Sequence, residues 1–374
     1  MSAMPSAPDR PRIESLWRRR LSPRELLLWI PLAPAAMLYE IVLAARLVFW
    51  RFARRRARVR IVSVGNLTVG GNGKTPFTLF LANRLARCGH RVAIVSRGFG
   101  GKRKGRAALV SDGGELLLLP EAAGDEPAMM ARSFEGPVAV AKRRIDGINL
   151  LGRTANPPDV VVLDDGFQHV RLARDVDIVL VNRERGLGNG WLLPAGPMRE
   201  PLGALKRAHA VVLVSQAPNE PSGLSRSQMK KLSRLPVLHA TLKPRALVRV
   251  ESGRWVEYPM GLAGRRVLAI SGLADSSGFY GMLRETDADL IGVLEYPDHH
   301  VYTPADWHAI VTAARDADLI VTTEKDLAKL ERFPFARDSL YALRLEVAMN
   351  AEDAARLDEI VSGNAASPRV AAQA

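Results

Sequence analysis

A glycine-rich stretch at residues 63–77, SVGNLTVGGNGKTPF, carries the clearest chemical signal in the sequence. Glycines let backbone NH groups approach phosphate oxygens closely, and a following lysine and hydroxyl residue can hold the β and γ phosphates and Mg²⁺. Thr68 stands where the standard loop has its first glycine, but the rest of the pattern is present. The stretch therefore predicts a phosphate-binding loop rather than a turn that binds nothing. Its expected nucleotide-binding residues are Gly70, Gly71, Asn72, Gly73, Lys74 and Thr75, with the Thr75 hydroxyl also a metal ligand.

Two neighbouring carboxylates follow an apolar run at residues 160–166, VVVLDDG. A phosphate-binding loop of this class needs an acidic residue at the end of a neighbouring strand to hold its metal ion. Asp164 and Asp165 are therefore predicted Mg²⁺ ligands, although two carboxylates in a solvated turn would give the same pattern. The loop and the acidic pair support each other as parts of one nucleotide site.

The segments that carry these motifs alternate between short β-branched runs and longer helical stretches. Residues 60–66 and 90–98 are typical of strands on either side of a helix over 76–89, which makes a βαβ unit and hence a parallel sheet. A second series of strands and helices begins near residue 265, so the sequence predicts an α/β fold. The expected division is 1–60 for an N-terminal attachment segment, 61–240 for the P-loop core, 241–262 for a strand-like linker, 263–362 for a smaller C-terminal α/β domain and 363–374 for a disordered tail.

The basic charge of the chain is concentrated near its N-terminus. The formal net charge is +14, and residues 1–60, with 13 arginines against 4 acidic residues, contribute +9 of it. Arginines beside an apolar run favour attraction to anionic lipid head groups, so no nucleic-acid partner is expected. The single cysteine, Cys88, excludes an internal disulfide and fits a reducing cytoplasm.

Residues 26–50 form an apolar stretch about as long as a membrane span, with Glu40 and Arg46 as its only charges. A cleaved signal peptide is one alternative, but the arginines at 51–60 oppose translocation. A buried helix of a soluble fold is another. Membrane attachment is favoured, either as a span or as an interfacial helix, with the following residues on the cytoplasmic side.

Other P-loop proteins fit the sequence less well than a small-molecule kinase. Membrane-associated ATPases with a deviant loop carry a lysine at the position of Val69, and TTEKD at 322–326 has the wrong spacing for the base-reading motif of GTPases. The runner-up is a different P-loop NTPase, acting in metal or cofactor delivery and docked at the membrane. A membrane scaffold that uses nucleotide as a switch is the non-enzymatic alternative.

Several short motifs together resemble the tetraacyldisaccharide 4'-kinase family, in order from about residue 61 to 330. They are VGNLTVGGNGKTP, SRGFGG, GDEP, DDGFQH, PAGPMREP, DHHVY and TTEKD, and the ordered set is specific although no single motif is decisive. The resemblance implies a P-loop kinase core and a smaller C-terminal domain with the active site between them, on the cytoplasmic face of the inner membrane. It also implies ATP and Mg²⁺ as cofactors, and phosphorylation of the 4'-hydroxyl of an acylated glucosamine disaccharide 1-phosphate, a lipid A precursor. Lipids of the inner-membrane surface would be further partners.

The resemblance also implies a catalytic pair. In the family, the aspartate of GDEP pairs with the histidine of the DH motif to activate the acceptor hydroxyl, which points to Asp125 and His299. Taken without the family, Asp125 and Glu126 would equally fit the start of a helix. His300 leaves open which histidine acts, and His299 is favoured because it directly follows Asp298.

Further site residues are expected around the metal carboxylates. The family has an arginine just past a strand that contacts the transferred phosphate, and the spacing favours Arg144 over Arg143, although solvated basic residues would look the same. Four more candidates near the substrate or behind the metal ligands are Glu126, Gln168, His169 and Glu200, of which Glu200 is the weakest.

Overall fold

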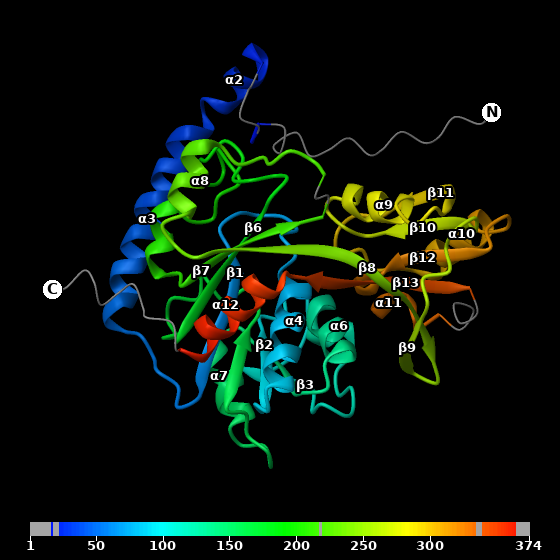
Figure 1. Ribbon diagram of the computed structural model, residues 1–374, viewed down its shortest axis with the longest axis horizontal. Coiled ribbons are helices and arrows are strands. Elements are labelled where there is room, and N and C mark those ends of the chain that lie inside the picture. Colours follow the sequence, from blue (N-terminus) through cyan, green and yellow to red (C-terminus); the bar gives the residue numbers. More distant parts are fainter. Residues whose placement is uncertain (1–15, 18–21, 217–218, 334–338, 364–374) are drawn as a thin grey trace.

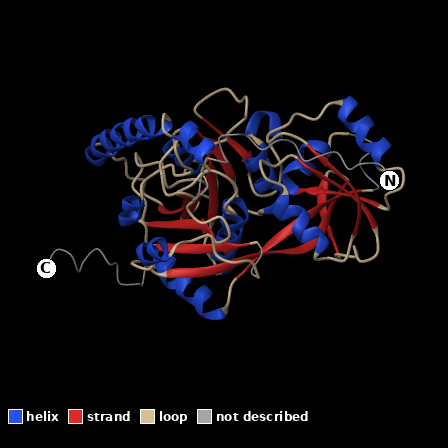
Figure 2. Cartoon of the chain, turned by 90° about the horizontal axis from the view of Figure 1, so that it is seen from above, coloured by secondary structure: helices blue, strands red, loops and turns tan. Residues whose placement is uncertain are grey.

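The structure is a computed structural model that describes residues 16–17, 22–216, 219–333 and 339–363. In this part of the chain, one sheet of 13 strands runs through the whole molecule, and helices cover both of its faces (Figures 1 and 2). The predicted α/β fold with a mostly parallel sheet is confirmed. The tail predicted to be disordered lies, from residue 364 onward, outside the described residues.

One half of the sheet forms the P-loop core. Across it the strands lie in the order β7 (Ala210–Ser215), β6 (Val176–Asn182), β1 (Arg60–Asn66), β5 (Val160–Leu163), β2 (Val92–Ser96), β4 (Val138–Ala141) and β3 (Ala107–Ser111). Neighbouring strands are parallel except β3 with β4. The helical segments of this half are α4 (Lys74–Arg87), α5 (Pro120–Ala123), α6 (Asp125–Ser133), α7 (Arg144–Leu151), η1 (Leu202–Arg207) and α8 (Arg226–Leu232).

Strand β1 shows why this half folds as a buried sheet. Val62 and Val64 belong to the apolar cluster on one face, and Ile61 belongs to the cluster on the other. Because successive side chains of a strand point to opposite faces, a strand covered on both sides carries apolar residues facing both ways. β1 ends at Asn66, so the phosphate loop begins at the carboxyl edge of the sheet, where open α/β sheets bind ligands.

The second half of the sheet contains four parallel strands. Their order is β11 (Asp289–Glu295), β10 (Arg266–Ser271), β12 (Leu319–Thr323) and β13 (Leu340–Ala348). The helices of this half are α9 (Ser277–Arg284), α10 (Pro304–Ala313) and α11 (Glu324–Leu330). Two apolar clusters, one containing Ile270 and the other Ala269, form its core.

The long strand β8 (Val237–Glu251) joins the two halves. Residues 237–241 pair in parallel with β7, and residues 241–248 pair antiparallel with β13. The end of β8 pairs with β9 (Arg254–Tyr258). The sequence predicted strand-like segments here but treated 241–262 as a linker. In the structure this segment belongs to the sheet itself, which continues from one half into the other (Figure 1).

Helix α12 (Ala351–Ser362) returns to the core half. Leu357 and Ile360 lie in the same apolar cluster as Val62 of β1. Arg84 of α4 binds Asp358 with a distance of 2.6 Å between Nε and Oδ1. The end of the segment 263–362, which was predicted to form one smaller domain, thus packs on the core half. We propose that the smaller domain ends with β13.

Helices α2 (Pro23–Trp29) and α3 (Leu32–Phe52) precede the core, and α3 lies along its outer edge (Figure 1). Ala36 and Leu43 face the protein, and the Tyr39 hydroxyl donates to the Arg199 carbonyl oxygen at 2.9 Å. The opposite side exposes apolar side chains that include Met37, Leu38, Ile41, Val42, Val48 and Phe49. Among the described helices, only α3 is long and apolar enough to cross a membrane, with a mean hydropathy of 1.7 over Leu32–Trp50.

Candidate active site

The phosphate loop connects β1 to α4 and uses backbone conformations that glycine allows. Gly70 and Gly73 have φ angles of +97° and +68°. Gly73 is the N-cap residue of α4, so the first NH groups of that helix face the loop. At Gly71, no described atom lies within 4 Å of the position that a Cβ would take. A phosphate group can therefore approach this backbone closely.

Thr68 braces the loop at the position where the standard pattern has glycine. Its side chain is buried, and its hydroxyl accepts a hydrogen bond from Asn72 Nδ2 at 3.2 Å. The same amide nitrogen donates to the carbonyl oxygen of Gly70 at 3.2 Å. The Asn72 side chain, which was expected to bind nucleotide, thus stabilises the loop from within, so only its backbone NH is left for a phosphate.

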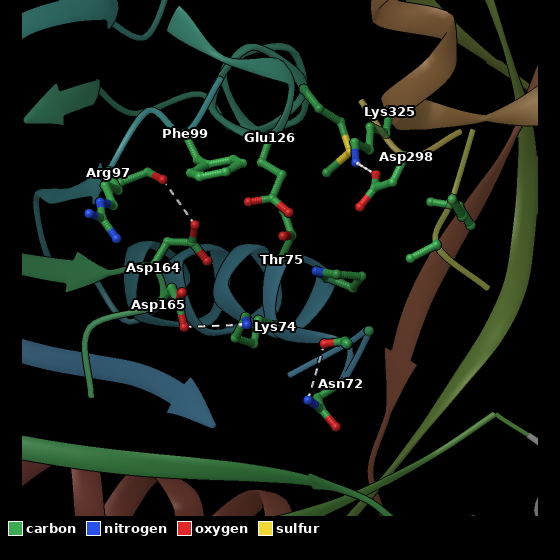
Figure 3. A pocket seen from close by; sticks show the side chains of 18 of the residues that line it. Asn72, Lys74, Thr75, Arg97, Phe99, Glu126, Asp164, Asp165, Asp298 and Lys325 are labelled. Carbon is green, nitrogen blue, oxygen red and sulfur yellow. Dashed lines mark hydrogen bonds and ion pairs between the residues drawn. The ribbon is translucent and has the colours of Figure 1, made fainter. Parts of the chain in front are cut away.

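Lys74 of the phosphate loop forms an ion pair with Asp165, which follows β5 (Figure 3). Lys74 Nζ lies 3.3 Å from Asp165 Oδ1 and donates to Asn66 Oδ1 at 3.3 Å. Arg199 contacts the other carboxylate oxygen at 3.0 Å. Burial opposes the ionisation of Asp165, but the charges of Lys74 and Arg199 outweigh it and hold its pKa below the usual range. Asp165 is therefore an ionised carboxylate beside the lysine of the loop.

Asp164 is almost fully buried next to Asp165. Its oxygens accept hydrogen bonds from Ser96 Oγ at 3.0 Å and Thr78 Oγ1 at 3.4 Å. Burial, followed by the negative charges of Glu126 and Asp165, raises the pKa of Asp164 to about 7. A cation bound at this point would relieve the repulsion among these carboxylates.

The donor set beside the loop fits Mg²⁺. Hydroxyl and carboxylate oxygens are the ligands that Mg²⁺ prefers, and Thr75, Asp164 and Asp165 all line the same cavity (Figure 3). Among the described residues, no group of three or more histidines, cysteines and carboxylates could hold a metal by itself. Mg²⁺ usually keeps several waters and shares substrate phosphates. Thr75, Asp164 and Asp165 therefore suit a Mg²⁺ ion whose remaining ligands come from water and from the phosphates of a nucleotide.

Asp125 and His299 meet from the two halves of the molecule. Asp125 is the first residue of α6, whereas His299 lies in the loop between β11 and α10, and His299 Nδ1 is 3.1 Å from Asp125 Oδ2. The Phe99 ring packs against the imidazole with a centroid distance of 5.3 Å. His299 has a φ of +59°, a conformation that few non-glycine residues adopt. The structure thus brings together the two residues predicted to form a pair.

Glycines fix the turn that carries Asp125. Gly124 has a φ of +94°, and a Cβ added there would lie 2.4 Å from the carbonyl oxygen of Phe99. A Cβ at Gly101 would lie 2.4 Å from the carbonyl oxygen of Ala122. The SRGFGG and GDEP motifs therefore pack backbone against backbone. This contact sets the positions of Phe99 and Asp125, both of which touch His299.

Arg144 is buried at the start of α7 and donates to the Asp164 carbonyl oxygen at 3.1 Å. Burial lowers the pKa of Arg144 to about 10, while the charges of Asp164 and Asp165 act in the opposite direction. Arg143 Nε instead lies 3.6 Å from a carboxylate oxygen of Asp146 within α7. Both arginines line the cavity, but Arg144 is the one attached to the loop of the acidic pair.

Three of the four remaining candidates, Glu126, Gln168 and His169, line the same cavity. Glu200 does not line it, because its buried carboxylate binds Arg207 at 2.7 Å. The prediction that placed Glu200 near Mg²⁺ or substrate therefore has no support in the structure. Of the two neighbouring histidines, His299 is the one that contacts Asp125. His300 Nε2 instead lies 3.1 Å from a carboxylate oxygen of Asp306.

Sequence reasoning missed charged residues of the site, among them Arg199 and Lys325. Arg199 lies within PAGPMREP, and its backbone NH donates to the Leu67 carbonyl oxygen at 2.7 Å, which brings it beside Asp165. Lys325, within TTEKD, binds Asp298 with 2.5 Å between Nζ and Oδ1 (Figure 3), and Asp298 directly precedes His299. The quoted motifs were the only signal for either residue.

These side chains surround a cavity of about 890 Å³ between the two halves. The phosphate loop and the acidic pair line one side, and His299 and Lys325 line the other. The wall also includes Tyr39 and Arg46 of α3. The cavity therefore connects a phosphate-binding loop, a histidine and the exposed apolar helix.

Comparisons with known proteins place the chain among known families. Residues 28–363 match the sequence model of the family described as Tetraacyldisaccharide-1-P 4'-kinase. The Tetraacyldisaccharide 4'-kinase of Syntrophus aciditrophicus (strain SB) is 37% identical over 373 residues, covering 94% of this chain and 97% of that protein. Its counterpart in Anaeromyxobacter sp. (strain Fw109-5) is 39% identical over 340 residues, covering 88% and 90%. A crystal structure of LpxK from Aquifex aeolicus in complex with ATP has a TM-score of 0.73 and 32% identity, covering 90% of this chain and 99% of that chain.

Proposed function

The chain belongs to the tetraacyldisaccharide-1-phosphate 4'-kinase family, and we propose that it carries out the family's reaction in the cavity between its two halves. It is a kinase of lipid A biosynthesis that uses ATP with Mg²⁺ to phosphorylate the 4'-hydroxyl of a tetraacyldisaccharide 1-phosphate. In this reaction the hydroxyl oxygen forms a bond to the γ-phosphorus, the bond to ADP breaks and the hydroxyl loses its proton. The protein must therefore hold the phosphates and accept one proton.

The contact between Asp125 and His299 is the observation that carries the catalytic part of this proposal. A hydrogen bond from His299 Nδ1–H to Asp125 leaves Nε2 as an acceptor, and His299 lines the cavity. We propose that Nε2 accepts the proton that the 4'-hydroxyl loses. Asp125 orients the ring and stabilises the charge that the ring gains. A general base in this position contributes roughly 10²- to 10⁴-fold to the rate.

The phosphate loop holds the donor nucleotide opposite this pair. The backbone NH groups that follow Gly70, with the Lys74 ammonium, are placed to bind the β and γ phosphates. Mg²⁺ held by Thr75, Asp164 and Asp165 would supply charge neutralisation at the transferred phosphate. Arg144 is a second source of positive charge on that side of the cavity.

Helix α3 is proposed to attach the enzyme to the cytoplasmic face of the inner membrane. Its exposed side is apolar, whereas Ala36, Tyr39 and Leu43 form a stripe against the core. A helix that packs on its own protein along one stripe suits the interface better than an isolated span. Because the cavity wall includes Tyr39 and Arg46, a lipid substrate could reach the site from this surface.

Transfer of label from [γ-³²P]ATP to an acylated glucosamine disaccharide 1-phosphate tests the proposal. Labelled lipid should form with the wild-type enzyme and Mg²⁺, and His299→Ala should abolish most of it while leaving ATP binding intact. Hydrolysis of ATP that is independent of lipid, with no labelled lipid, would instead indicate a different P-loop NTPase.

A further inference from the structure

Lys329 on α11 places a buried positive charge directly behind the pair of Asp125 and His299. Its side chain is only 9% exposed, and Nζ lies 3.5 Å from Asp125 Oδ2. That oxygen is also the one that His299 Nδ1 contacts at 3.1 Å. Burying an ammonium group is costly unless it is paired with acceptors. The groups that contact Lys329 Nζ therefore indicate its role.

The ammonium group of Lys329 faces acceptors from three different segments. Besides Asp125 of α6, Nζ lies 3.2 Å from Asp326 Oδ1 and donates to the carbonyl oxygen of His300 at 3.2 Å. The Tyr302 ring covers it, with Nζ 5.3 Å from the ring centroid. An ammonium group has three hydrogens to donate. One side chain therefore connects the core, α11 and the loop that presents His299.

Asp326 gives this connection a fixed end in the second half of the molecule. It is fully buried, and Oδ2 accepts hydrogen bonds from the Gly272 NH at 2.9 Å and from Thr323 Oγ1 at 2.7 Å. A Cβ at Gly272 would lie 2.7 Å from Asp326 Oδ1, so the backbone there passes directly against the carboxylate. The hydrogen bonds from Gly272 and Thr323 thus fix the position of Asp326, and Asp326 in turn holds Lys329.

We infer that Lys329 is a positioning residue for the kinase reaction: its ammonium group holds the Asp125 carboxylate in place, oriented towards His299. Without Lys329, the Asp125 carboxylate would lose the ion pair that fixes its position. The imidazole that it orients would then be held less precisely for accepting the proton of the acceptor hydroxyl. This inference rests on the proposed function.

A purely structural role for Lys329 predicts different behaviour. Lys329 and Asp326 are three residues apart on α11, and this ion pair alone would stabilise the helix. In that case, removal of Lys329 would lower stability without a specific effect on kcat. It would also have the same effect whether or not Asp125 carries a charge. These differences can be measured.

The experiment compares Lys329→Met and Lys329→Arg with the wild-type enzyme in the label-transfer assay. We expect Lys329→Met to lower kcat roughly 10- to 100-fold, as for other residues that orient catalytic groups, with little change in KM for ATP. Lys329→Arg, which keeps the charge, should recover part of kcat. In an Asp125→Asn background, Lys329→Met should cost much less, because the residue on which it acts is already neutral.

Arg332→Met is the matched control. Arg332 forms another ion pair between the halves, with Glu121 at 3.0 Å, without contacting Asp125. The Arg332→Met variant should keep wild-type kcat. The inference is overturned by wild-type kcat in Lys329→Met, or by a full loss that persists in the Asp125→Asn background.

If Lys329→Met does not fold, Lys329→Gln and Lys329→Arg give the same comparison. Lys329→Arg should then retain the larger kcat, and equal values would overturn the inference. A wild-type enzyme that fails to label the lipid would point to the proposed function as the error instead.

Discussion

Replacing Gly124 by alanine tests whether the backbone contact between SRGFGG and GDEP positions the catalytic pair. Gly124 has φ +94° and ψ 154°, a conformation that is nearly confined to glycine and costs an alanine roughly 1–3 kcal/mol. The new Cβ would also lie 2.4 Å from the carbonyl oxygen of Phe99, whereas ordinary contact begins at 3.4 Å. The two backbones must therefore separate by about 1 Å.

This displacement falls on Asp125, the next residue, and on Phe99, and both contact His299. A misplacement of about 1 Å at a reacting group can cost on the order of 10²-fold, so kcat of Gly124→Ala should fall by about that factor. KM for ATP should change little, because the phosphate loop lies in a different turn. Initial rates of label transfer at varied ATP give both quantities, and thermal melting reports the loss of stability.

Gly114→Ala is the matched control for this substitution. A Cβ at Gly114 would meet only Asp112 Oδ1, at 3.6 Å, so this variant should keep wild-type kcat. Wild-type kcat in Gly124→Ala would refute the reasoning, since the contact would then not determine where Asp125 lies.

Three further predictions follow from the same structure. Lys74→Ala should raise KM for ATP as well as lower kcat, because its ammonium group lies in the phosphate loop beside Asp165; steady-state rates that change in kcat alone would contradict this. Burial, followed by the charges of Arg144 and Arg174, lowers the pKa of His169 from 6.5 to about 3, so the unfolded state binds a proton in this range that the folded state does not. Stability should therefore fall as the pH decreases from 6.5 towards about 3, and urea unfolding of His169→Gln should show a smaller decrease than the wild type; equal decreases would count against it. Ile41→Glu with Phe49→Glu, both on the exposed side of α3, should weaken sedimentation with anionic vesicles while ATP binding is unchanged, and undiminished sedimentation would place the attachment elsewhere.

The nucleotide side of the site could be predicted from the sequence because its signals are local. The strand over 60–66, the glycines and the Lys-Thr pair lie within one short segment, and backbone geometry decides their function. The acidic pair follows β5 directly, and parallel strands bring their carboxyl ends to one edge. Thr68 shows the limit of such reasoning, since its bond to Asn72 became visible only in three dimensions.

The acceptor side depends on contacts between residues far apart in the sequence. Asp125 and His299 are separated by 174 positions, so only the resemblance to a family could pair them before the structure was known. Lys329 reads as a solvated lysine of a helix, and nothing local shows that it is buried against Asp125. The contact of Glu200 with Arg207, which lies on the 3₁₀ helix η1, was likewise not visible in the sequence.

The sheet presented a similar difficulty. The alternating pattern after residue 237 predicted strands, but pattern alone does not say which strands pair. β8 pairs with β7 at one end and β13 at the other, so the segment expected to be a strand-like linker carries the sheet from one half into the other.

The central claim is that Asp125 and His299 act as one unit on the acceptor hydroxyl, and a double-mutant cycle tests it most directly. The values of kcat/KM for the lipid are measured for the wild type, Asp125→Ala, His299→Ala and the double variant. Groups that act together are strongly non-additive. The double variant should therefore be about as slow as the slower single variant. If the two losses multiply, the residues act independently and the account of the site is contradicted.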